Sequence, residues 1–176
     1  MFGAGGMVTG VLNKDVEENT GGFERAAAKY VSRGGGAPLA FIDEVLAAEV
    51  ADRGLAVARK DKKGSALVCA LWMSRALLFI GRFGAALIST PGAAPPDVAK
   101  AVYDAVLRPY HGFLVASVVS LAFSLAPSRA DFFKRMSTDE ASARDELDAF
   151  VRVVLPTVER LHTWFVESGY NFPDKA

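Results

Sequence analysis

The chain has 176 residues, of which 51% are hydrophobic and 23% are charged, and its 20 basic and 20 acidic residues cancel. This composition indicates one folded globular domain and excludes a disordered or collagen-like chain. The absence of a basic block disfavours nucleic-acid binding. The single cysteine, Cys69, excludes an intramolecular disulfide and favours a reducing compartment, so we expect a cytoplasmic protein.

Helical spacing of apolar residues dominates the chain, and alternating strand-like runs are nearly absent, so we predict an all-α fold. Turns rich in glycine and proline, such as TGG at 20–22 and STPGAAPP at 89–96, divide the chain into about six elements. Ser137 or Thr138 is expected to cap the last helix. The expected helices are 8–20, 23–32, 38–58, 64–89, 97–126 and 139–168.

The N-terminus, MFGAGGMVTGVLN, lacks the early positive charges of a secretory signal. The apolar segment 112–126 is shorter than the roughly 18 to 20 residues that cross a bilayer. The longer segment 66–88 is interrupted by Arg75 and Arg82. We therefore expect a soluble, unsecreted protein without a transmembrane helix.

Prolines shape the start and the middle of the fifth expected helix. Pro95 and Pro96 precede DVAKAVYDAVL and favour a helix start there. Pro109 lies inside the helix, where it removes a backbone donor and is expected to bend or break it. His111 is then expected just beyond the bend.

Two constellations combine groups that are suited to binding. In DVEEN, Asp15 and Asn19 lie four residues apart on one helical face, where a carboxylate beside an amide suits a hydroxyl-rich ligand. In ALWMSRALLFIGRF, Trp72, Arg75 and Phe79 share a face with a flat aromatic surface, a fixed cation and an apolar wall. Taken alone, each set is better explained by ordinary surface or core positions.

A third constellation surrounds one of the two histidines. Tyr103, Leu107 and His111 follow helical spacing. The same face continues into Val115, Val118 and Val119. A polar cluster therefore caps an apolar stripe. By itself this is a weak signal, because a lone histidine on an apolar face is more often a satisfied core residue than a ligand-binding group.

Templates for catalysis and metal binding are missing from the sequence. It contains no GxSxG, HExxH or CxxC motif and no phosphate-cradling glycine loop ahead of a lysine. His162 is too isolated in sequence to indicate a metal ligand. A pairing of His111 with Asp15 as acid and base would lack a nucleophile or a metal set. We therefore expect no enzymatic activity, no metal and no cofactor.

Taken together and in this order, the three segments resemble the glycolipid transfer protein family. The stretch AVYDAVLRPYHGFLVASVVSLAFSLAPSRADFFKRMS at 101–137 is similar to that family's succession of Tyr, Tyr-His-Gly-aromatic, Ala-Pro and Asp-Phe. LWMSRALLFI at 71–80 is similar to its Trp-x-x-Arg-x-Leu-x-Phe helix, and DVEEN is similar to its Asp-(Val/Ile)-x-x-Asn motif. The resemblance covers residues 2–168.

The resemblance implies a single domain over residues 1–176, folded as a two-layer helical sandwich with an interior hydrophobic lipid pocket. It implies that the protein binds a glycosphingolipid and transfers it between membranes through peripheral, transient contact and without covalent chemistry. Two alternatives stay open. One is a ceramide-1-phosphate carrier that uses Arg75 and a rearranged Arg25, and the other is a lipid sensor or scaffold that does not transfer.

The resemblance also implies roles for individual residues. Asp15 and Asn19 match positions that bond sugar hydroxyls, and Trp72 matches the position that stacks on the first sugar. His111 matches the position that bonds the ceramide amide region, and Phe113 falls where the family often has a membrane-contacting tryptophan. Further matches are the headgroup positions Arg75 and Tyr103 and the pocket positions Phe79 and Leu107. Because lipid tails must be enclosed, the apolar residues Val115, Val118, Val119 and Phe123 are further candidate pocket walls.

Two features depart from the family pattern, and a third bears on the choice of headgroup. Gly22 stands where the family usually has a lysine or arginine, three residues after the motif asparagine. Val68 and Trp72 stand where the phosphate-selective branch is expected to have cations, which favours a sugar headgroup. The chain starts close to the aspartate motif, so the family's first helix is expected to be missing, and a second copy is expected to be able to close that wall as a homodimer.

Overall fold

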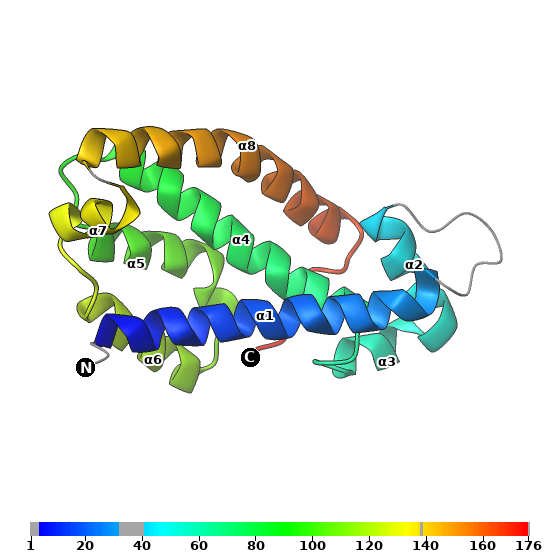
Figure 1. Cartoon of the computed structure of the whole chain (residues 1–176). Coiled ribbons are helices and arrows are strands. Elements are labelled where there is room, and N and C mark those ends of the chain that lie inside the picture. Colours follow the sequence, from blue (N-terminus) through cyan, green and yellow to red (C-terminus); the bar gives the residue numbers. More distant parts are fainter. Residues whose placement is uncertain (1–3, 32–40, 138, 176) are drawn as a thin grey trace. The chain divides into compact units, whose positions relative to one another are not determined.

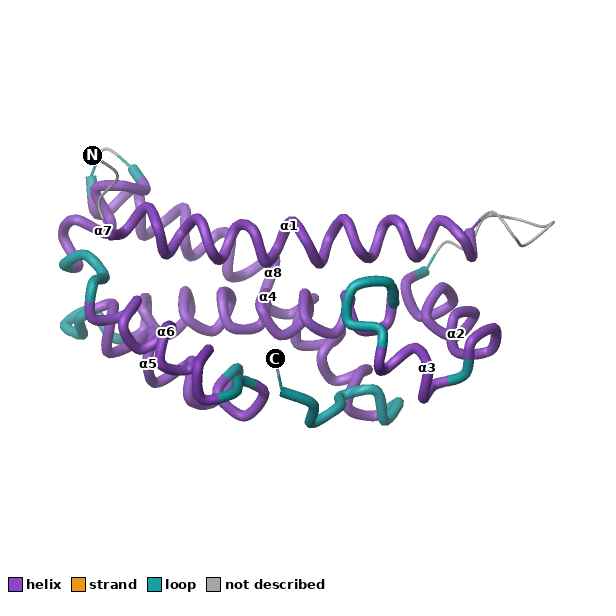
Figure 2. Tube along the Cα trace, turned by 90° about the horizontal axis from the view of Figure 1, so that it is seen from below, coloured by secondary structure: helices purple, strands orange, loops and turns teal. Residues whose placement is uncertain are grey.

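The computed structural model describes residues 4–31, 41–137 and 139–175, with side chains from residue 14 onward except that of Asp15. Within these residues the secondary structure is helical, with turns and bends between helices and no strand (Figures 1 and 2). The all-α prediction is confirmed. The chain divides into two compact units, the first formed by Met1–Gly10 with Arg75–Ala176 and the second by Val11–Ser74. The single domain stays a prediction.

Helix α1 runs without a break from Ala4 to Val31 and crosses the TGG segment at which the sequence predicts a turn. That prediction is wrong. A glycine inside a helix costs about 1 kcal/mol relative to alanine, but tertiary packing compensates for it here. A Cβ atom on Gly22 would lie 2.7 Å from the Sγ atom of Cys69. The neighbouring segment therefore comes too close for any side chain at this position.

Helices α2 (Ile42–Arg53) and α3 (Leu55–Lys60) replace the single helix that the sequence predicts over 38–58. The helix is interrupted at Gly54, whose φ of 78° lies outside the right-handed helical region. Residues 38–40 of the expected helix lie outside the described residues.

A buried carboxylate fixes the start of α4 (Ala66–Ser89) within the second unit. Glu49 has no exposed surface, and its Oε2 atom accepts from the Ser65 hydroxyl at 3.1 Å and the Leu67 amide at 2.8 Å. Its Oε1 atom pairs with Arg53 at 2.9 Å. These bonds satisfy donors at a helix N-terminus, where no intrahelical carbonyl is within reach.

The predicted break at Pro109 is confirmed. Helix α5 (Pro95–Val106) begins at the proline pair, as the sequence predicts, and is followed by the 3-10 turn η1 (Arg108–Tyr110). Helix α6 (Phe113–Ser124) starts after two extended residues. Because proline supplies no amide to the α-helical ladder, the chain tightens into the turn and leaves His111 beyond it.

Helix α7 (Arg129–Met136) is absent from the sequence prediction, which has no helix between residues 126 and 139. Ser128 caps this helix, since its Oγ atom accepts from the Asp131 amide at 3.2 Å. The spacing of a serine and an aspartate three residues later is the local signal that could have indicated this start.

Helix α8 (Glu140–Glu167) is capped by Asp139, whose carboxylate accepts from the Ser142 amide at 2.8 Å. The predicted cap at Ser137 is therefore wrong by two residues, and Thr138 lies outside the described residues. An aspartate is an equally good acceptor for the first-turn amides, and its charge also complements the helix dipole.

In the first unit, α8 packs along the later part of α4 (Figure 1). A Cβ atom on Gly81 would lie 2.9 Å from Leu155, and one on Gly84 would lie 2.8 Å from Val151. The helices therefore approach too closely for larger side chains. Two groups of buried residues form the core of this unit: Leu87, Val98, Phe133 and Ala143, and then Leu78, Val106 and Val158.

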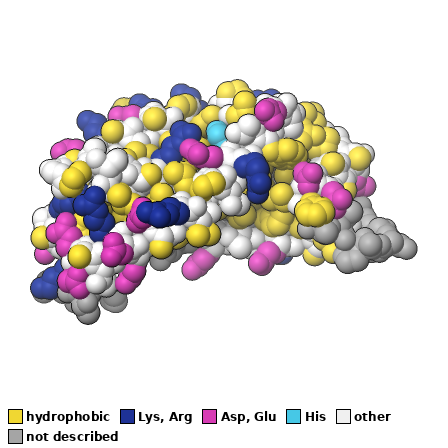
Figure 3. Space-filling view, turned by 90° about the horizontal axis from the view of Figure 1, so that it is seen from above, with side chains coloured by type: hydrophobic (Ala, Val, Ile, Leu, Met, Phe, Trp, Pro, Cys, Tyr) yellow, Lys and Arg dark blue, Asp and Glu magenta, His cyan; other side chains and the backbone are white. Residues whose placement is uncertain are grey.

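Helix α4 is the one single helix in the described part of the chain that is long and apolar enough to cross a membrane. Helices α6 and α7 pass the same test only as a pair bent by 91°. Within the apolar window of α4, 56% is buried inside the protein, as in the core helix of a globular protein. On the face drawn in Figure 3, charged side chains of both signs lie interspersed with apolar ones.

Candidate functional site

The pairing of Tyr103 with His111 is the first part of the site. The Oη atom of Tyr103 lies 2.9 Å from Nδ1 of His111, and Phe123 packs edge-on against the Tyr103 ring at 5.6 Å. The sequence prediction of one continuous helical face is wrong, because the chain leaves the helix at Leu107. The turn nevertheless returns His111 to Tyr103. When the tyrosine donates to Nδ1, the Nε2 atom carries the ring proton and can donate to a ligand carbonyl.

Burial lowers the pKa of His111, and the positive charges of Arg75 and Arg108 lower it further. Burial also lowers the pKa of His162 on α8, together with the charges of Arg75 and Arg82. Both imidazoles are therefore neutral in the folded protein at neutral pH, so that one ring nitrogen donates and the other accepts. Among the residues that the structure describes, no three His, Cys, Asp or Glu side chains gather to hold a metal ion.

We expect the free energy of unfolding to fall as the pH drops below about 6.5. In the unfolded chain both histidines have their ordinary pKa, so they bind protons at a pH at which the folded protein leaves them neutral. Lowering the pH therefore favours the unfolded state, down to the pKa values of the folded protein. Urea unfolding of the wild type and of a His111→Gln, His162→Gln double variant measures this effect. Equal pH slopes in the two proteins would contradict it.

Arg75 is directed into the protein and away from solvent. It is 1% exposed, and its Nη2 atom donates to Asn171 Oδ1 at 2.8 Å and to the Phe172 carbonyl at 2.5 Å. Burial lowers the pKa of Arg75 to about 10, which leaves it charged at neutral pH. Headgroup binding by Arg75 stays a prediction, and the partners described here are protein groups.

The second unit carries Asp15, Asn19 and Trp72. Asp15 and Asn19 lie one turn apart on α1, but the Asp15 side chain lies outside the described residues. Asn19 and Trp72 are half-buried. Their sequence neighbours meet, since the Thr20 hydroxyl donates to the Met73 sulfur at 3.6 Å. The binding roles of these three residues stay predictions.

Gly22, which stands where the family usually has a lysine or arginine, is closely packed. A Cβ atom on Gly22 would lie 2.7 Å from the Cys69 sulfur and 3.2 Å from the Lys63 carbonyl oxygen. Arg25 does not take the place of that cation, because α1 continues through both glycines without rearrangement. The Arg25 guanidinium folds back along α1, with Nη1 3.0 Å from the Cβ position of Gly21.

Gly22→Lys is expected to lower the free energy of unfolding by about 2–3 kcal/mol, because α1 and α4 must separate to admit a side chain. The matched control is Gly21→Ala. A Cβ atom there meets only the end of the flexible Arg25 side chain, and alanine stabilises a helix by up to about 1 kcal/mol relative to glycine. Urea unfolding compares the two, and wild-type stability in Gly22→Lys would contradict the close packing.

The candidate pocket residues are mostly shielded from solvent. Phe79 and Leu107 pack against the buried Leu78, Val106 and Val158 group, and Val115, Val119 and Phe123 are half-buried on α6. Val118 differs, because it is 60% exposed. Helix α6 turns Ala116, 5% exposed, inward, and Val118 lies about 200° further around the helix. Val118 therefore faces solvent on α6 in this structure, and its pocket role stays a prediction.

Sequence reasoning misses several residues that organise the first unit. Tyr110 lies within the quoted RPYHG stretch without an assigned role, and the Arg75 guanidinium lies 3.5 Å from its ring centroid. Asn171 and Phe172 bond to Arg75 across separations of 96 and 97 residues. No local pattern marks such contacts, because they depend on how the end of α8 returns the chain to α4.

The family model described as glycolipid transfer protein (GLTP) matches residues 1–138 of the 176. The chain therefore belongs to the glycolipid transfer protein family. Glycolipid transfer protein B of Xenopus laevis is 28% identical over 124 residues, which cover 65% of this chain and 59% of that protein. The chain spans about half the length of the curated relatives it matches.

Two solved structures show the same fold. HET-C2, a fungal glycolipid transfer protein, superposes with a TM-score of 0.69 and 23% identity, covering 88% of this chain and 71% of that one. A variant of Arabidopsis ACD11 in complex with C12 ceramide-1-phosphate superposes with a TM-score of 0.57 and 18% identity, covering 90% and 98%. At these identities the likeness shows the fold alone, and it confirms the glycolipid transfer protein fold.

Proposed function

We propose that the protein binds a glycosphingolipid and transfers it between membranes without covalent chemistry. Family membership supports lipid transfer. The choice of a sugar headgroup rests on three positions of the second unit that carry no cation. Val68 is an apolar residue only 5% exposed, Trp72 is aromatic, and Gly22 is packed against Cys69. A phosphate removed from water needs paired cations, and these positions supply none.

In this proposal each headgroup residue has a distinct task. Trp72 offers a flat apolar face to a sugar ring, and Asp15 and Asn19 exchange hydrogen bonds with its hydroxyls. His111, held at Nδ1 by Tyr103, bonds the amide region of the ceramide. A wrong headgroup would leave such groups unpaired, at about 1–3 kcal/mol for each lost bond.

The lipid chains set the second requirement. Each methylene costs about 0.8 kcal/mol to expose to water, so an 18-carbon chain carries on the order of 14 kcal/mol. A carrier must therefore enclose the chain almost completely. We propose that Phe79, Leu107, Val115, Val119 and Phe123 contribute to that enclosure, since all five are half-buried apolar residues of the first unit.

A ceramide-1-phosphate carrier is the second candidate, because ACD11, whose structure contains that lipid, has the same fold. This candidate would rely on Arg75 and Arg25. Arg75, however, is buried against Tyr110, Asn171 and Phe172. Arg25 folds back along its own helix. The observed positions of both arginines therefore favour a sugar headgroup.

A vesicle assay with labelled glucosylceramide and labelled ceramide-1-phosphate tests the proposal. We expect faster transfer of the glucosylceramide. A clear preference for the phosphate lipid would overturn the choice of headgroup. Tight binding of either lipid without transfer between vesicles would instead support a lipid sensor or scaffold.

We also propose that α6 makes the contact with membranes. Phe113 is 81% exposed, Leu114 is 78% exposed, and Val118 and Leu121 are 60% and 62% exposed. Leu114, Val118 and Leu121 follow helical spacing, so they form one apolar stripe on the surface. Contiguous exposed apolar surface of this kind suits the boundary between lipid headgroups and acyl chains.

The double variant Phe113→Asp, Leu114→Asp is expected to slow transfer by about tenfold or more, since burying each apolar side chain is worth about 1.5–3 kcal/mol. Its stability should stay near that of the wild type, because both side chains face solvent. Val153→Asp on α8 is the matched control, at 72% exposure. Transfer and vesicle co-flotation measure the effect, and equal losses in the control would exclude a specific role of α6.

We further propose that the protein works in the cytoplasm. Cys69 is the single cysteine of the sequence, and its thiol is buried, which suits a reducing compartment. A homodimer that closes one wall stays a prediction. Size-exclusion chromatography with light scattering tests it directly.

A further inference from the structure

The residues that follow α8 stay in contact with the end of that helix. After α8 ends at Glu167, the Ser168 hydroxyl donates to the Trp164 carbonyl at 2.7 Å. The Tyr170 ring then packs on Trp164 at 5.7 Å, and Phe172 is 6% exposed. The C-terminal segment, residues 168–175, therefore packs against the first unit over part of its length.

Three polar side chains contact one another here: Arg75 of α4, Tyr110 of η1 and Asn171 of the C-terminal segment. The Arg75 guanidinium donates to the Asn171 side-chain oxygen at 2.8 Å and stacks 3.5 Å from the centroid of the Tyr110 ring. Asn171 in turn donates to the Tyr110 hydroxyl at 3.1 Å. Each member thus contacts the other two, and Arg75 also holds the Phe172 carbonyl.

The buried charge of Arg75 explains why these contacts form. Arg75 is 1% exposed, so its charge depends on acceptors inside the protein. The C-terminal segment supplies two of them, the side chain of Asn171 and the main chain of Phe172. Both bonds leave the Nη2 atom, whose two hydrogens have fixed directions in the plane of the guanidinium, and the face of that plane suits the aromatic ring of Tyr110, which the ammonium of lysine would not cover in the same way.

Tyr110 links the contacts of Arg75 to His111 through the backbone. It is the last residue of η1 and immediately precedes His111. Two short-range backbone bonds hold this turn, one from the Tyr110 amide to the Leu107 carbonyl and one from the His111 amide to the Arg108 carbonyl. Two side chains also hold the turn. Tyr110 contacts Arg75 and Asn171, and His111 is hydrogen-bonded to Tyr103.

We propose that Arg75, Tyr110 and Asn171 form a latch that holds the C-terminal segment against the His111 turn, and that Arg75 is a positioning residue instead of a headgroup ligand. The part of this proposal that concerns lipid transfer rests on the proposed function. The latch itself is a property of the folded first unit, so it can be tested without any lipid.

The test uses the full chain with Asn171→Ala, Tyr110→Phe and Arg75→Lys, and Thr163→Ala on an exposed position of α8 as the control. We expect amide exchange of residues 169–175 to rise about tenfold in Asn171→Ala and Arg75→Lys, as local opening becomes easier. The imidazole nitrogen signals of His111 should shift in the same variants. Tyr110→Phe keeps the ring under the guanidinium and should show a smaller change of both kinds.

Glucosylceramide transfer distinguishes positioning from direct binding. A latch predicts that Asn171→Ala and Arg75→Lys slow transfer in parallel, by about three- to tenfold, as one buried hydrogen bond is lost. Loss of transfer in Arg75→Lys alone, with wild-type rates in Asn171→Ala and Tyr110→Phe, would identify Arg75 as a ligand and overturn the proposal. Should Arg75→Lys fail to fold, Asn171→Ala and Tyr110→Phe still decide through exchange and the His111 signals.

Failure of the proposed function would look different. A wild-type protein that moves no glucosylceramide would refute lipid transfer while leaving the latch testable. In that case, increased exchange and shifted His111 signals in Asn171→Ala still support the latch. Unchanged exchange and unchanged signals in that variant would refute it, whatever the lipid assay gives.

Discussion

Trp72→Ala is expected to slow glucosylceramide transfer by about tenfold, which corresponds to about 1.4 kcal/mol of lost binding free energy. The indole is half-buried on α4 and is proposed to stack on the first sugar ring. Its removal takes away a flat apolar face, and Val68 one turn earlier is buried, at 5% exposure. Stopped-flow transfer between donor and acceptor vesicles gives the rate.

Two further variants sharpen this result. Trp72→Phe keeps a flat ring of smaller area and should retain an intermediate rate. Asp15→Val removes an acceptor for sugar hydroxyls and should slow transfer as Trp72→Ala does. If Trp72→Ala and Asp15→Val both fold and both transfer at the wild-type rate, binding of a sugar headgroup at these residues is refuted.

Glu49→Leu is expected to lower the free energy of unfolding by about 3–5 kcal/mol, because two buried donors lose their acceptor at about 1–3 kcal/mol each and one ion pair is broken. Glu49 has no exposed surface and holds Arg53 at 2.9 Å and the Leu67 amide at 2.8 Å. Its loss leaves the Ser65 hydroxyl and the Leu67 amide without their common acceptor, whereas Arg53 keeps Asp61 at 2.7 Å. Because those donors start α4, the variant should also disturb Trp72 two turns later.

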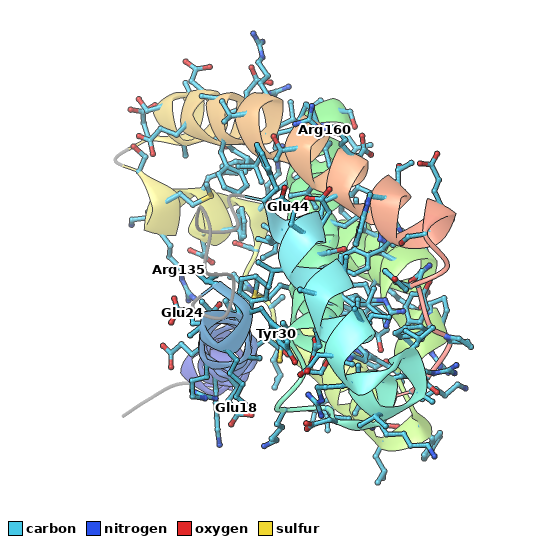
Figure 4. The ribbon with its side chains drawn as sticks, turned by 90° about the vertical axis from the view of Figure 1, so that its right-hand side faces the viewer. Glu18, Glu24, Tyr30, Glu44, Arg135 and Arg160 are labelled. Carbon is cyan, nitrogen blue, oxygen red and sulfur yellow. The ribbon has the colours of Figure 1, made fainter. Side chains whose placement is uncertain are left out.

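Urea unfolding measures this loss, with Glu24→Gln as the control for removing a carboxylate. Glu24 is exposed on α1 (Figure 4), so its variant should stay within about 0.5 kcal/mol of the wild type. Glu49→Gln should fall between the two, because the amide keeps one acceptor oxygen. A Glu49→Leu protein as stable as Glu24→Gln would show that the buried pair contributes no net stability.

Local sequence signals predicted those elements whose ends depend on neighbouring residues. Pro95 marked the start of α5, and Pro109 marked the break before His111. The prediction failed where tertiary contacts decide. Gly22 signals a turn by itself, yet the contact with Cys69 keeps it inside α1. Val118 lies on the apolar run after His111, and only the orientation of α6 shows that its side chain is 60% exposed.

The sequence by itself determined the all-α class and the family, because helical periodicity and the ordered DVEEN, LWMSRALLFI and YHGF motifs are properties of neighbouring residues. Only the tertiary structure decided what surrounds those motifs. It brings Tyr103 within hydrogen-bonding distance of His111, and Asn171 within hydrogen-bonding distance of Arg75, 96 residues earlier in the sequence. Such contacts arise when helices pack and bring distant segments together, so no spacing within the chain encodes them.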